Sequence, residues 1–196
     1  ILPGLVIGSV IGYMLAVFAT NSPRFGATGL NIIAAISAIP TVALAAVILQ
    51  WTRDVSNDVD VRSYVMKLVI VTVVSTASMT LNAYRGLTEL KPFALDLMKS
   101  YAANKMTVLF YLRAPNSLPY IFISLKVSVP ACVIAALVSE YFAEKITGVG
   151  RRIRECILQA QYSTAWAYIV TACIIGIVLF AILMASEKLI MRKRSS

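Results

Sequence analysis

The chain has 196 residues, of which 59% are hydrophobic and 14% are charged, and its formal net charge is +9. A soluble domain is usually about 45–50% apolar and about 25% charged, so this composition argues against one and indicates a surface matched to lipid. The basic residues lie between apolar runs, which argues against a nucleic-acid-binding face. The three cysteines lack CxxC spacing and there is no histidine, so neither a metal site nor a redox motif nor the usual general base has support.

Five apolar segments come close to the roughly 20 residues that a helix needs to cross the hydrocarbon core. In chain order they cover residues 2–20, 29–51, 64–84, 118–141 and 164–186. They are rich in Ala, Gly, Ser and Thr, which allow helices to pack closely in a membrane. The sequence therefore predicts an all-α integral membrane protein, with about five transmembrane helices in a single domain over residues 1–196.

Charges in the loops predict the orientation. The loop 85–118 carries five basic residues and the tail 188–194 carries four, whereas the loop 52–63 carries three aspartates. Because positively charged loops stay in the cytoplasm, we expect the first two inside and the third outside. The basic loop around 145–154 disagrees, since the same arrangement places it outside.

The stretch 92–119 is too polar to span a membrane, yet it is patterned. Four apolar residues recur in it at near-helical spacing: Phe93, Leu97, Tyr101 and Val108. This spacing predicts one or two short amphipathic helices. We expect Pro115 and Pro119 to break the helix and redirect the chain into the fourth span. Such helices could lie in the lipid interface or dock into a groove of a soluble partner.

Residues 96–105 read Asp-Leu-Met-Lys-Ser-Tyr-Ala-Ala-Asn-Lys, and Pro115 follows Ala102 after 13 positions. This run resembles the EAA loop of binding-protein-dependent ABC importer permeases. Asp96 stands where that family usually has Glu, and Ala102 stands where it has Gly. If the family turn requires a positive φ, alanine would be strained there, whereas a helical conformation would accept it.

Two further segments are similar to the nitrate, sulfonate and taurine branch of these permeases. They are Ala38-Ile39-Pro40 with Val42-Ala43-Leu44, and Ser139-Glu140 followed by Gly148-Val149-Gly150. The resemblance runs from about residue 5 to residue 190. Permeases of this branch usually have one more helix at the N-terminus, so we expect the chain to lack an N-terminal helix.

The resemblance implies the permease subunit of an ATP-driven ABC importer, in the bacterial inner membrane, that forms the translocation path for a small solute. It implies as partners two ABC ATPase subunits, a second permease copy, an extracytoplasmic solute-binding protein and membrane lipid, but no nucleic acid. ATP and Mg²⁺ would be bound by the ATPase, because this chain has no G-x-x-x-x-G-K-[ST] motif and is not itself expected to be an enzyme. The solute could be nitrate, a sulfonate, taurine or a vitamin precursor.

The resemblance assigns ATPase coupling to the loop 85–118. Its expected coupling residues are Asp96, Lys99, Tyr101, Ala102, Ala103, Asn104, Lys105, Pro115 and Pro119. The expected translocation path takes its residues from the spans: Pro40, Ser78, Asn82, Pro130, Ser139 and Glu140.

Simpler roles stay open for the path residues. Glu140 could cap a helix or pair with Lys145, the prolines could be packing kinks, and Ser78 and Asn82 could bond neighbouring helices. Two other functions also stay open. A stand-alone secondary transporter or channel should have ionisable residues deep in several spans or repeated halves, but Lys126 is the main charge within a span and no repeat is seen. A membrane scaffold would hold partners without transporting a solute.

Overall fold

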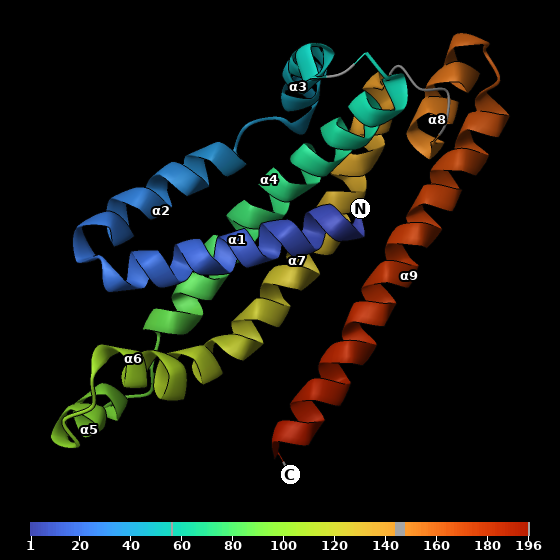
Figure 1. Cartoon of the computed structure of the whole chain (residues 1–196). Helices are drawn as coiled ribbons and strands as arrows, with labels where there is room; N and C mark the ends of the chain where they lie inside the picture. Colours follow the sequence, from blue (N-terminus) through green and yellow to red (C-terminus); the bar gives the residue numbers. More distant parts are fainter. Residues whose placement is uncertain (56, 144–147, 196) are drawn as a thin grey trace.

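The computed structural model describes residues 1–55, 57–143 and 148–195 (Figure 1). In chain order the helices are α1 (Leu2–Asn21), α2 (Pro23–Ser37), α3 (Thr41–Val55), α4 (Val59–Thr88), α5 (Ala94–Ser100), α6 (Lys105–Val108), the π-helix η1 (Leu109–Arg113), α7 (Ala114–Phe142), α8 (Val149–Leu158) and α9 (Tyr162–Ser195). Four helical stretches of these ranges are long and apolar enough to cross a membrane: α1, α4, the run Lys105–Phe142 and α9. The bent pair of α2 and α3 makes a fifth if it counts as one span. The predicted all-α membrane bundle is confirmed.

The second predicted span is not one straight helix. It divides into α2 and α3, whose axes differ by 87° across a short break that contains Pro40. Proline has no N–H to donate and disfavours the helical conformation of the residue before it, so a helix stops ahead of Pro40. The carbonyl of Pro40 then accepts the amide of Ala43 at 3.0 Å, which begins α3. Pro40 therefore separates two helices, where the sequence predicted a single span.

Small residues set the contact between α1 and α4. Gly4, Gly8 and Gly12 repeat every four residues along one buried face of α1. A Cβ atom on Gly8 would lie 1.9 Å from Ser75 Oγ and 2.5 Å from the carbonyl oxygen of Thr72. The two backbones can approach this closely only because no side chain stands between them, as in the G-x-x-x-G packing of membrane helices.

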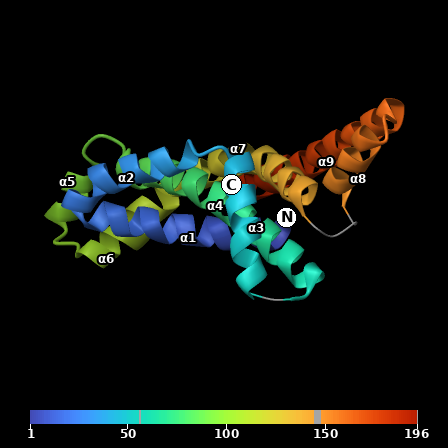
Figure 2. The ribbon, with the colours of Figure 1, turned by 90° about the horizontal axis from the view of Figure 1, so that it is seen from above.

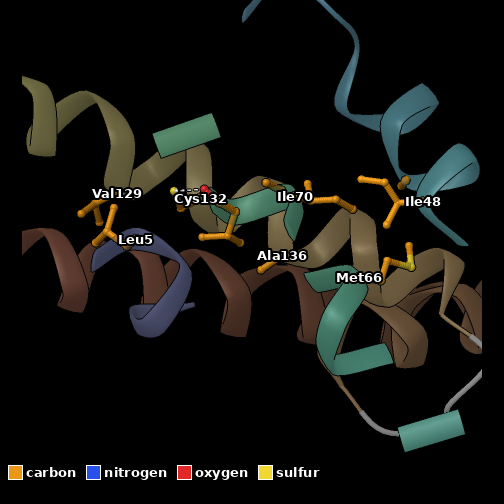
Figure 3. Close-up of a cluster of buried hydrophobic side chains, with 10 residues drawn as sticks. Leu5, Ile48, Met66, Ile70, Val129, Cys132 and Ala136 are labelled. Atoms are coloured by element: carbon orange, nitrogen blue, oxygen red, sulfur yellow. Dashed lines mark hydrogen bonds between the residues drawn. The ribbon is translucent and has the colours of Figure 1, made fainter. Parts of the chain in front are cut away.

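The main hydrophobic cluster joins four helices at the centre of the bundle. Figure 3 shows its members: Leu5 from α1, Ile48 from α3, Met66 and Ile70 from α4, and Val129, Cys132 and Ala136 from α7. By contrast, only 6% of the membrane-spanning window of α9 is buried. Seen from above, α8 and α9 project away from α1 and α2 (Figure 2). The packed centre of the chain is therefore α1, α4 and α7, and α9 presents most of its surface outward.

The connecting segments are divided between the two ends of the bundle. The loop with α5 and α6 lies at the same end as the C-terminus, and α3 and α8 lie at the opposite end (Figure 1). This is the arrangement of ends that the loop charges predicted.

The basic loop that disagreed with this orientation has a structural explanation. The guanidinium groups of Arg151 and Arg154 donate to the carbonyl oxygens of Ala143 and Tyr141, each at 3.3 Å. Carbonyls at a helix C-terminus lack intrahelical donors, and cations are favoured there. These two arginines therefore bind the C-terminal carbonyls of α7, which gives them a structural role independent of the orientation of the chain in the membrane. Of the other two basic residues of the loop, Arg152 contacts Glu155 at 3.4 Å on α8, and Lys145 lies outside the described residues.

Candidate coupling site

The loop between α4 and α7 is anchored at its base by α7. The amide of Asn116 donates to the carbonyl oxygens of Gly86 at 2.8 Å and Glu89 at 3.0 Å, which closes the C-terminal end of α4. The hydroxyl of Tyr120 donates to Glu89 Oε2 at 2.9 Å. Both ends of the loop are thus held together, and the segment beyond them projects as a unit from the end of the bundle (Figure 1).

The short helix α5 ends in a left-handed turn at Ala102. The amide of Ala102 donates to the carbonyl of Lys99 at 2.9 Å, and the amide of Ala103 donates to the carbonyl of Met98 at 3.0 Å. This pair of bonds is the Schellman motif, in which the residue after the helix has a positive φ and is usually glycine. Ala102 has a φ of 51°. The turn therefore has the positive φ that the resemblance left undecided, and it carries alanine in a glycine conformation.

Because left-handed backbone disfavours a Cβ atom, Ala102→Gly is expected to stabilise this turn by about 1 kcal/mol. The measurement is hydrogen exchange at the amides of residues 102 and 103, which should slow in the variant. Ala103→Gly is the matched control, because Ala103 is not among the residues with positive φ. There the added backbone freedom should speed exchange, and equal effects of the two substitutions would contradict the assignment.

Asn104 begins the second short helix of the loop. Its Oδ1 accepts hydrogen bonds from the backbone amide and the hydroxyl of Thr107, both at 2.8 Å. An Asn at this position replaces the missing partner of a helix N–H and fixes where the helix begins. Lys105 is the first residue of α6, so the structure separates the two predicted amphipathic helices by a turn of defined geometry.

The surface of the loop is apolar and exposed. Six large side chains are involved: Phe93, Leu97, Tyr101, Met106, Phe110 and Tyr111. Phe93 is 83% exposed, Tyr111 is 79% exposed and Tyr101 is 77% exposed. Asp96 and Lys99 form an exposed ion pair of 3.1 Å on α5, a kind of contact that contributes little to stability. Several exposed aromatic and aliphatic residues on one loop that is held at its base are typical of an interaction surface.

Pro115 and Pro119 do not break the helix as predicted. α7 begins at Ala114 and continues through both prolines, and the helical run extends from Lys105 to Phe142. Pro115 lies in the first turn of α7, where a helix tolerates the missing N–H. The π-helix η1 directly precedes it and widens the turn upstream. The prolines therefore lie inside the entry of the fourth span.

The residues predicted for a translocation path do not meet at one place. Ser78 and Ser124 share a hydrogen bond of 3.3 Å between α4 and α7, and Asn82 donates to the carbonyl of Ser78 at 2.9 Å. Ser139 is buried and donates to the carbonyl of Ala136 at 2.7 Å. Pro130 lines an apolar groove of about 500 Å³ between α7 and α9. Pro40 is exposed between α2 and α3. A path through these residues stays a prediction.

Glu140 has a partner that the sequence analysis missed. Its Oε1 lies 2.5 Å from Nζ of Lys67 on α4, and its Oε2 accepts the backbone amide of Gly150 at 3.0 Å. Lys67 was visible as the only charge in the third span, but nothing in the spacing indicated which acid it would meet. A second pair, Lys126 with Glu187 at 2.7 Å, joins α7 to α9.

A bundle of membrane-spanning helices with an anchored, exposed helical loop at one end is the layout of a transport permease. The chain belongs to the family described as binding-protein-dependent transport system inner membrane component, whose profile matches residues 8–196. It is similar to the formylaminopyrimidine transport permease protein ThiX of Halalkalibacterium halodurans, with 24% identity over 188 residues, 96% of this chain and 72% of that protein. It is also similar to a probable ABC transporter permease protein of Haemophilus influenzae, with 26% identity over 138 residues, 70% of this chain and 53% of that protein.

The family membership settles the class of function. The chain is a non-enzymatic permease subunit of an ABC transporter, a multi-pass protein of the bacterial inner membrane. The family works with ATPase subunits and a solute-binding protein.

Proposed function

We propose that the loop 85–118 is the EAA loop of an importer and that α5, within this loop, docks into a cleft of the ATPase subunit. The observation that carries this proposal is the exposure of Phe93, Tyr101 and Tyr111 on a loop whose base is fixed to α4 and α7. Exposed aromatic residues are the usual anchors of protein interfaces. ATP and Mg²⁺ are bound by the ATPase, and its closure moves the loop together with the entry of α7.

The permease works as a dimer with an identical or homologous second copy, and a solute-binding protein delivers the solute from outside. The assignment to the nitrate, sulfonate and taurine branch rests on the similarity of residues 38–44 and 139–150 to segments of that branch. The solute is a small molecule, and the first candidate to test is a formylaminopyrimidine, because the ThiX relative is named for its transport. Alternating access by rigid-body motion of the helices transmits the ATPase cycle to the path.

A photo-crosslinking amino acid in place of Tyr101 tests the docking of the loop. Tyr101 is 77% exposed, so the substitution does not disturb the packed bundle. Illumination in native membranes should give an adduct with the ATPase subunit. The control places the same amino acid at Trp166, which is 66% exposed and lies near the start of α9, at the end of the bundle away from the loop. This position should give no ATPase adduct. No adduct from position 101, or equal adducts from both positions, would contradict the docking.

A further inference from the structure

Glu140 is the point at which three helices meet at the end of the bundle opposite the coupling loop. It lies in the last turn of α7, and its side chain is 16% exposed. One carboxylate oxygen contacts Lys67 on α4, and the other accepts the Gly150 amide in the first turn of α8. The carboxylate thus uses each oxygen for a different neighbouring helix. A carboxylate near the N-terminus of a helix is also favoured by the helix dipole.

The chain around the start of α8 is shaped to fit this carboxylate. Gly148 has a φ of 121°, and a Cβ atom there would lie 2.7 Å from Cδ of Glu140. A Cβ atom on Gly150 would lie 2.3 Å from the carbonyl oxygen of Leu137 and 2.9 Å from Cβ of Glu140. Both glycines are therefore required by the close approach of α7. Glu140 and the Gly-x-Gly segment are separated in the sequence by the connection between α7 and α8, and they meet in the fold through the hydrogen bond of Gly150 to Glu140.

The attachment is reciprocal. α7 supplies the carboxylate that binds the first turn of α8, and α8 supplies Arg151 and Arg154 to the terminal carbonyls of α7. Each helix end thereby receives a group of the opposite charge. Under α8 lies Cys156, which is 7% exposed and free. Its thiol is a natural reporter of whether α8 stays on the bundle.

We propose that Glu140 is a positioning residue that holds α8 against α7, so that α4, α7 and α8 move as one body at this end of the permease. The carboxylate sets the position of α8 together with Arg151 and Arg154, which bind the terminal carbonyls of α7. This role differs from that of a group lining the solute path.

The test is the rate at which N-ethylmaleimide modifies Cys156 in the purified full chain, measured by mass spectrometry in a Cys173→Ala background. Cys173 is exposed, whereas Cys132 is fully buried in the core and reports on the bundle itself. Glu140→Ala removes both contacts and should raise the Cys156 rate roughly tenfold or more, since a charge-assisted hydrogen bond is lost. Cys132 should stay unreactive.

Two further variants separate positioning from general stability. Exchanging the two charges in the double variant Lys67→Glu with Glu140→Lys restores the pair between α4 and α7 but offers no acceptor to Gly150. It should recover the thermal stability lost in Glu140→Ala while Cys156 stays reactive. Glu187→Ala removes the other interhelical ion pair and should leave the Cys156 rate unchanged.

The proposal is overturned if Glu140→Ala leaves the Cys156 rate within about twofold of the parent, which corresponds to less than one lost hydrogen bond. It is also overturned if Cys132 becomes reactive together with Cys156, because Glu140 would then support the whole bundle. The proposal is likewise overturned if Cys156 is protected in the charge-exchanged variant, or if Glu187→Ala raises the rate at which Cys156 is modified.

Discussion

Gly8→Ala will force α1 away from α4 and destabilise the helix bundle by about 1–3 kcal/mol, the usual cost of overpacking a close contact. The new Cβ atom would meet Ser75 Oγ at 1.9 Å and the backbone oxygen of Thr72 at 2.5 Å. A side chain could rotate away, but the carbonyl belongs to α4 and can yield only if the helix moves. The measurement is the unfolding midpoint of the purified protein in mild detergent, obtained from a thermal or denaturant titration.

Gly176→Ala is the matched control for this substitution. Both glycines lie in membrane-spanning helices, but the nearest atom to a Cβ on Gly176 is Val133 Cγ1 at 3.8 Å, which is an ordinary contact. Alanine is a better helix former than glycine by about 1 kcal/mol, so this variant should be as stable as the parent or slightly more stable. Similar losses in both variants would show that the close packing of α1 on α4 is not the cause.

Asp96→Lys combined with Ala103→Trp is expected to uncouple ATP hydrolysis from uptake. The double change reverses a charge on the exposed face of α5 and adds a bulky ring beside its C-terminal turn. Loss of shape and charge complementarity at the centre of an interface typically weakens binding by roughly tenfold or more. The fold should persist, because the Asp96–Lys99 pair is 70% and 68% exposed and such pairs contribute at most about 1 kcal/mol.

Two readouts decide this second prediction: the amount of ATPase that co-purifies with the permease, and solute uptake into cells. Arg152→Glu is the control. It also reverses one exposed charge, on α8 at the opposite end of the bundle, where Arg152 has a 3.4 Å contact with Glu155. It should leave ATPase association unchanged. Normal uptake with a full complement of ATPase in the loop variant would remove the coupling role from α5.

Much of the fold was predictable because membrane spans depend on composition more than on detail. The places of α1, α4 and α9 follow from apolar runs, although α4 and α9 extend beyond the predicted spans into charged residues. The spacing of Phe93, Leu97 and Tyr101 predicted one or two short helices in the coupling loop, and the structure has α5 and α6 there. The resemblance to the EAA loop placed the family's glycine position at Ala102, where the structure has a turn. Its positive φ could not be derived, because alanine gives no signal of a left-handed conformation.

Features that depend on two distant segments were not predictable. The repeat of Gly4, Gly8 and Gly12 was present in the sequence, but α4 as its partner emerges only from the fold. The same holds for the pair of Lys67 with Glu140, which are 73 residues apart. The effect of each proline on its helix was also not predictable. Pro40 lies at a break that divides a predicted span into two helices, whereas Pro119, which was expected to break a helix, lies inside α7.

Purification of the permease from native membranes in mild detergent, with mass spectrometry of the proteins that accompany it, tests most directly whether the coupling loop docks on an ATPase. An ABC transporter permease with a docked coupling loop should bring down an ATPase subunit in stoichiometric amount, and the Asp96→Lys with Ala103→Trp variant should lose it. Recovery of the permease without any ATPase, under conditions that preserve a known ABC importer complex, would contradict docking of the loop on an ATPase and favour a stand-alone transporter.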